Sequence, residues 1–195
     1  MTETIKYYNK NALNFITSTQ QVEFHEIQRK FTEILPNGAA ILDFGCGSGR
    51  DAKYFLSQGY QVDAADGSEE MCRLAGEYLK APVRQMLFQE LSAEHVYDGI
   101  WACSSILHLP YGELKDVFFK MSRALKEKGI VYTSFKYGTF EGERNGRYFT
   151  DMTEEKMEKL LQETSVFHEE EQWISSDVRP GRGDEKWLNI ILRKN

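Results

Sequence analysis

An apolar segment near the start of the chain runs directly into a glycine-rich turn: residues 39–49 read AAILDFGCGSG. Apart from Asp43, residues 39–44 are apolar and carry β-branched Ile41 in the middle, which predicts a short buried strand. The glycines at 45, 47 and 49 predict a tight turn from this strand into a helix. Because glycine has no side chain, a ligand can approach the backbone N–H groups at the helix start.

The segments around this turn alternate between helical and strand patterns. Apolar residues repeat at helical spacing over residues 21–35, 52–56, 68–79 and 110–125, and the last of these helices is expected to end at Gly129. Further strands are predicted at residues 60–66, 82–88, 97–103 and 130–135. Alternating strands and helices indicate a parallel sheet with helices on both faces, a doubly wound α/β fold.

The C-terminal part follows another pattern. A polar, glycine-containing loop is expected over residues 136–149, then a helix that carries Met157, Leu160 and Leu161. Two strands are predicted at residues 169–175 and 186–193, joined by a basic loop without a helix. Strands joined in this way should form an antiparallel hairpin.

Composition limits the class of protein. A length of 195 residues with 41% hydrophobic residues suits one domain with one core. There is no apolar leader pattern and no run of about 18 apolar residues, so we expect no membrane partner. Three cysteines without a C-x-x-C pair favour a reducing cytoplasm. The net charge of -6 disfavours a broad basic surface for nucleic acid.

Two acidic residues stand at strand ends where a nucleotide would bind in an open α/β sheet. Asp43 ends the first strand, and Asp66 ends the second strand 23 residues later. A carboxylate at Asp66 suits the two hydroxyls of a ribose held over the glycine turn. The alternative is a plain turn with Asp66 capping the next helix. Arg50 occupies the position of the third glycine in the dinucleotide motif G-x-G-x-x-G, which opposes a nicotinamide oxidoreductase.

Residues 42–49, LDFGCGSG, resemble the first motif of class I S-adenosylmethionine-dependent methyltransferases, and the similarity extends over most of the chain. The resemblance implies a Rossmann-like, mostly parallel seven-stranded sheet closed by the C-terminal antiparallel hairpin. It also implies S-adenosylmethionine as cofactor and S-adenosylhomocysteine as product. No metal is implied.

Family roles carry over to positions that match the family's motifs. The cofactor-binding residues implied by the resemblance are Tyr7, Asp43, Gly45, Cys46, Gly47, Asp66, Gly67, Met71, Phe88, Gln89, Ala102 and Cys103. Among them, Gln89 follows the third strand, where many family members have an aspartate that binds the adenine amine, and Gln89 could make that contact instead. Tyr7 belongs to an N-terminal segment similar to the part that folds over the cofactor, although a tyrosine there could equally be a packing residue.

One methyltransferase domain is therefore expected over residues 1–195. Residues 1–37 would form a helical lid, residues 38–135 the cofactor-binding core, and residues 136–195 the acceptor-side loop and closing hairpin. His108, just after the fourth strand, is the candidate general base, the alternative being a loop histidine that caps or packs.

The expected acceptor is a small or medium polar molecule, with negative charge suggested by three residues of the loop after the fifth strand: Lys136, Arg144 and Tyr148. Glu141 and Glu143 in the same loop could instead neutralise these cations in a solvated turn. Two further functions stay open. One is methylation of a transfer-RNA wobble base, which would make RNA a partner, and the other is a catalytically silent regulatory module that only binds the cofactor.

Overall fold

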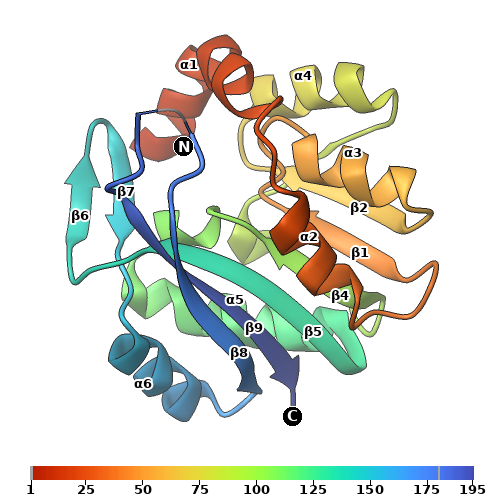
Figure 1. The fold of residues 1–195 in the computed structure, drawn as a ribbon, viewed down its shortest axis with the longest axis vertical. Coiled ribbons are helices and arrows are strands. Elements are labelled where there is room, and N and C mark those ends of the chain that lie inside the picture. The colour runs from red at the N-terminus through yellow and green to blue at the C-terminus, as the bar shows by residue number, and fades with distance from the viewer. Residues whose placement is uncertain (1, 180) are drawn as a thin grey trace.

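The structure is a computed structural model that describes residues 2–179 and 181–195. Its elements are, in chain order, α1 (Glu3–Thr19), α2 (His25–Thr32), β1 (Ala40–Phe44), α3 (Arg50–Ser57), β2 (Gln61–Asp66), α4 (Glu69–Leu79), β3 (Arg84–Gln85), the 3-10 turn η1 (Phe88–Glu90), β4 (Tyr97–Ala102), the 3-10 turn η2 (Ile106–His108), α5 (Tyr111–Ala124), β5 (Leu125–Lys136), β6 (Glu141–Arg144), β7 (Arg147–Thr150), α6 (Glu154–Thr164), β8 (Phe167–Ser176) and β9 (Lys186–Lys194) (Figure 1). In the described residues, no helix combines the length and hydrophobicity needed to span a membrane.

Seven strands form one sheet in the order β3-β2-β1-β4-β5-β9-β8. The first five run parallel, whereas β9 pairs antiparallel with both β5 and β8. This confirms the predicted doubly wound, mostly parallel sheet with a C-terminal antiparallel hairpin. The chain continues from β1 to β2 on one side and later reaches β4 on the other, so a crevice opens at the carboxyl end of β1.

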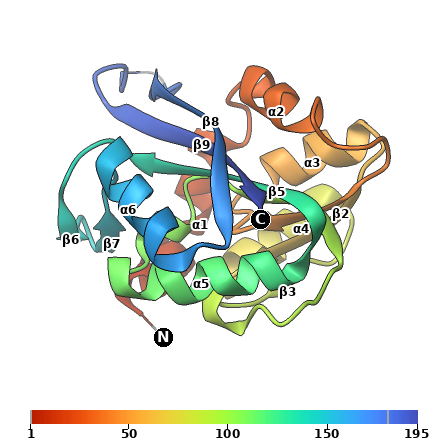
Figure 2. The same ribbon diagram turned by 90° about the horizontal axis from the view of Figure 1, so that it is seen from below.

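Helices cover both faces of the sheet, as the apolar stripes predict. Figure 2 shows α2 and α3 on one side and α5 on the other. On the first side, Phe31 and Phe55 pack with Trp101 in a fully buried aromatic cluster. On the second, Leu114 and Met157 belong to the larger apolar cluster under α5 and α6. Apolar burial on both faces is what stabilises a parallel sheet of this kind.

Two predicted boundaries are wrong. Helix α5 ends at Ala124, and β5 begins at Leu125, five residues before the predicted strand. Lys128 has a φ of 62°, and regular pairing of β5 with β4 resumes at Ile130, so the irregular start of the strand hides its first residues from a pattern search. The third strand is only Arg84–Gln85, because it pairs with only the last two residues of β2, Ala65 and Asp66.

The expected loop over residues 136–149 is also wrong in part. Residues Glu141–Arg144 and Arg147–Thr150 pair antiparallel as the hairpin β6–β7. Asn145 and Gly146, with φ of 53° and 75°, form its two-residue turn. Asn-Gly is the residue pair that this type of turn favours, so the sequence carried a signal for the hairpin.

Candidate active site

The glycine turn after β1 is built by short backbone hydrogen bonds to the end of β2. The N–H groups of Gly45 and Cys46 donate to the carbonyl of Ala65 at 2.8 and 2.9 Å. A Cβ at Gly45 would lie 2.4 Å from the Cβ of Ser105, so only glycine fits there. Gly47, with a φ of 52°, would place a Cβ 3.2 Å from the ring of Phe15 on α1. The turn therefore brings the ends of β1, β2 and β4 together beneath α1.

Asp66, the last residue of β2, holds the glycine turn in place through its carboxylate. One carboxylate oxygen accepts the N–H of Gly47 and the other accepts the N–H of Ser68, each at 2.9 Å. Burial raises the pKa of Asp66, against the stabilising effect of these backbone donors. A carboxylate here has further lone pairs for hydroxyl donors from a ligand.

A cavity of about 730 Å³ extends from the glycine turn to the loop between β8 and β9. Such a volume is typical of small-molecule sites. The predicted site residues that line it are Gly45, Cys46, Gly47, Asp66, Gly67, Met71, Phe88, Gln89, Cys103, His108, Lys136, Arg144 and Tyr148. The structure thus brings together residues spread over more than half of the chain.

Three predicted cofactor residues do not line this cavity: Tyr7, Asp43 and Ala102. Asp43 is buried behind the turn, where its carboxylate accepts the N–H of Ala52 at 3.0 Å and its pKa is raised by burial and by nearby Asp51. This contact holds the start of α3 against β1. Ala102 is buried in the core, and Tyr7 lines a separate outer groove.

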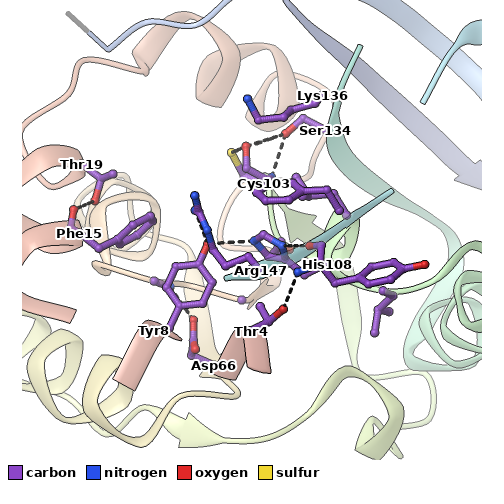
Figure 3. Close-up of a pocket in the computed structure, with 18 of the residues that line it drawn as sticks. Thr4, Tyr8, Phe15, Thr19, Asp66, Cys103, His108, Ser134, Lys136 and Arg147 are labelled. Atoms are coloured by element: carbon purple, nitrogen blue, oxygen red, sulfur yellow. Dashed lines mark hydrogen bonds between the residues drawn. The ribbon is translucent and has the colours of Figure 1, made fainter. Parts of the chain in front are cut away.

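Tyr8, the residue next to Tyr7, is the one that faces the cavity. Its hydroxyl lies 2.9 Å from Nε2 of His108, and Nδ1 of His108 lies 2.6 Å from the carbonyl of Tyr148 (Figure 3). A carbonyl only accepts, so Nδ1 carries the proton and Nε2 accepts from Tyr8. These bonds, with the N–H of Tyr148 donating to Thr4, tie α1 to η2 and β7.

The environment of His108 makes the ring a weak proton acceptor. Burial lowers its pKa to about 4, reinforced by Arg147 and opposed by the Tyr148 carbonyl. The ring is therefore neutral near pH 7, and both of its nitrogens are already engaged. In this arrangement His108 positions Tyr8.

The three predicted acceptor residues lie at the far end of the cavity, each with an acidic partner. Lys136 forms an ion pair with Glu185, and Arg144 with Asp151 at 2.6 Å. The hydroxyl of Tyr148 donates to Glu141 at 3.2 Å. In the cofactor part, Gln89 is exposed and donates to Glu113 at 2.5 Å, at the mouth of the cavity.

Several lining residues at the acceptor end were missed as individual site residues. Arg147 lies on β7, and the β8–β9 connection supplies Asp177, Arg179, Arg182 and Glu185. The basic character of this connection was visible in the sequence, but its place at the acceptor end of the cavity depends on the position of β9 next to β5. No group of three or more His, Cys, Asp or Glu within residues 2–179 and 181–195 could hold a metal ion.

Comparison with known proteins agrees with this geometry. A protein-family model described as a methyltransferase domain matches residues 41–129. YqeM of Bacillus subtilis (strain 168), which carries a provisional methyltransferase assignment, is 29% identical over 113 residues. The match covers 52% of this chain and only 46% of YqeM, so the chain spans about half the length of this curated relative.

Solved structures share the whole fold. The 1,6-didemethyltoxoflavin-N1-methyltransferase of Burkholderia thailandensis, solved with 1,6-didemethyltoxoflavin and S-adenosylhomocysteine, is 21% identical, with a TM-score of 0.79 over 98% of this chain and 87% of that chain. The [4+2]-cyclase SpnF has a TM-score of 0.74 at 15% identity, over 97% of this chain and 94% of that chain. The methyltransferase-domain match over residues 41–129, the strand order and the glycine turn with Asp66 all agree with the resemblance to class I S-adenosylmethionine-dependent methyltransferases, whose fold this chain shares.

Proposed function

We propose that the protein binds S-adenosylmethionine and transfers its methyl group to a small or medium polar acceptor. The observation that carries this proposal is a single cavity with two chemically different ends. One end has the glycine turn and Asp66, and the other has Lys136, Arg144 and Arg147.

The first end fits an adenosyl group. The glycine turn lines this end of the cavity, and Asp66 presents a half-buried carboxylate to the hydroxyls of a ribose. Buried Met71 and half-buried Phe88 provide apolar surface for adenine. When bound there, the cofactor would supply a sulfonium methyl group as electrophile.

The chain's contribution to methyl transfer would be orientation and exclusion of water. The reaction replaces the sulfonium charge by neutral sulfur, so a dry site that aligns the acceptor favours it. Helix α1 places Tyr8 and Phe15 on the cavity wall, which supports the lid function expected for residues 1–37. A protein base is needed only for an acceptor that keeps its proton near neutral pH.

The test is incubation with methyl-labelled S-adenosylmethionine and a cell extract separated into metabolites, RNA and protein. Label in the metabolite fraction, together with S-adenosylhomocysteine, supports the proposal. Label in RNA would favour the wobble-base alternative, whereas cofactor binding without turnover in any fraction would favour a silent regulatory module. Asp66→Ala, which should weaken cofactor binding, is the control for label that does not come from this site and is compared with wild type at a cofactor concentration that does not saturate the variant.

A further inference from the structure

Arg147 has an unusual environment for an arginine. Its guanidinium carbon lies 4.6 Å from the centroid of the Tyr7 ring, 5.8 Å from that of Tyr8 and 5.1 Å from that of Phe149. Its hydrogen bond to a side chain is from Nη1 to the Tyr8 hydroxyl, at 3.4 Å. Figure 3 shows Arg147 beside Tyr8 and His108, in the middle of the cavity wall. The aromatic rings cover its faces and leave its N–H edge for a partner.

Arg147 also lacks the carboxylate that other arginines have. Among the described residues, every arginine except Arg84 and Arg147 lies within ion-pair distance of an Asp or Glu. Arg84 is exposed on the edge strand β3, where water solvates its charge. Arg147 is half-buried, and its Nε is fully buried without a hydrogen-bond partner in the described part of the chain. A buried donor without a partner is costly, so an anion that accepted a hydrogen bond from Arg147 would be stabilised here.

The position of Arg147 gives an anion two approaches. Besides the cavity, an outer groove runs between α1 and the β8–β9 connection. Arg147, Arg179 and Arg182 line both the cavity and the groove. Arg179 is held by Asp177, and Arg182 lies 3.5 Å from Glu185, which also pairs with Lys136. Among these three arginines, Arg147 is the one that has no carboxylate within ion-pair distance in the described residues.

We propose that Arg147 is an oxyanion subsite for the methyl acceptor, which therefore carries a carboxylate or a phosphate group. This inference rests on the proposed function. A planar guanidinium can give two parallel hydrogen bonds to either group, and the surrounding rings hold it in place. The Tyr8 hydroxyl donates to His108, so its oxygen is free to accept from Arg147 and orient it. The anionic group would sit at Arg147 while another part of the acceptor reaches toward the cofactor end.

The experiment measures anion binding separately from turnover. The protein saturated with S-adenosylhomocysteine is titrated with inorganic phosphate in one series and with acetate in another, at constant ionic strength held with chloride. The wild-type protein should bind one of these oxyanions at millimolar concentrations, and the preferred one distinguishes a phosphate from a carboxylate acceptor. Arg147→Met should weaken that binding at least tenfold, and Arg147→Lys should restore part of it.

Two controls keep the result interpretable. Arg84→Met removes the other arginine without a carboxylate partner and should leave anion binding unchanged. Circular dichroism shows that each variant is folded, and the affinity of each variant for S-adenosylhomocysteine should change less than threefold.

Three results would overturn the inference. The first is no binding of either oxyanion by the wild-type complex, and the second is equal binding by Arg147→Met. The third is a tenfold or larger loss of S-adenosylhomocysteine affinity in a folded Arg147→Met, which would assign Arg147 to the carboxylate of the cofactor. Normal anion binding without methyl transfer to any fraction would count against the proposed function and leave the subsite intact.

Discussion

Replacing His108 by glutamine should remove a pH dependence of stability that originates in the cavity wall. The glutamine amide keeps a donor and an acceptor for Tyr148 and Tyr8 but does not titrate. In the native protein, burial lowers the pKa of His108 from 6.5 to about 4. In the unfolded chain its pKa returns to the ordinary value.

The sign and size of this pH dependence follow from the difference between the pKa of His108 in the native protein and in the unfolded chain. Between pH 6.5 and 4 the unfolded chain binds a proton at His108 that the native protein does not bind, so the free energy of unfolding falls as the pH falls. The contribution is fully present above pH 6.5 and is lost progressively toward pH 4. A difference of 2.5 pKa units corresponds to up to about 3 kcal/mol.

Urea unfolding at pH 7 and at pH 4.5, for wild type and His108→Gln, measures the effect. The wild-type protein should lose about 2–3 kcal/mol more than the variant over this interval, since other titrating groups contribute equally to both. His25→Gln, at an exposed histidine, is the matched control and should follow the wild type. Equal losses in wild type and His108→Gln would refute a lowered pKa at His108.

Three further predictions concern the cavity. Asp66→Ala should weaken S-adenosylhomocysteine binding by about 1.5–3 kcal/mol, the range for hydrogen bonds to a charged group. The control Asp116→Ala, at an exposed aspartate, should not weaken it. If calorimetry shows undiminished binding by Asp66→Ala, Asp66 does not bind the ribose. Gly47→Val should stay folded by circular dichroism but lose cofactor binding. Gly59→Val, which is also at a positive φ but has open space around it, should keep cofactor binding. Normal cofactor affinity of Gly47→Val would mean that the glycine turn has only a structural role. Tyr8→Phe should lower the free energy of unfolding by about 1–3 kcal/mol because Nε2 of His108 loses its donor. Tyr7→Phe should change it little, and equal effects of the two substitutions would argue against the pairing of Tyr8 with His108.

Much of the fold could be predicted because its signals are local. The apolar run before Gly45, the position of Asp66 and the stripe on α5 each depend on spacing within one element, and the structure keeps all three. The predictions that are wrong lie where local signals conflict. Gly129 looks like a helix end, yet β5 begins before it, and the Asn145-Gly146 turn was overlooked within a polar segment.

The sequence by itself therefore determined the order of strands and helices from β1 to β5, the glycine turn and the carboxylate that follows it, since each is encoded by neighbouring residues. Only the tertiary structure decided that Tyr8 meets His108, 100 residues away, and that Arg147 reaches Tyr8 across 139 residues. Contacts between distant residues depend on how the sheet orders its strands and where α1 lies across their ends. Burial in that arrangement lowers the pKa of His108 and leaves Arg147 without a carboxylate, because both properties depend on the exclusion of water rather than on sequence spacing.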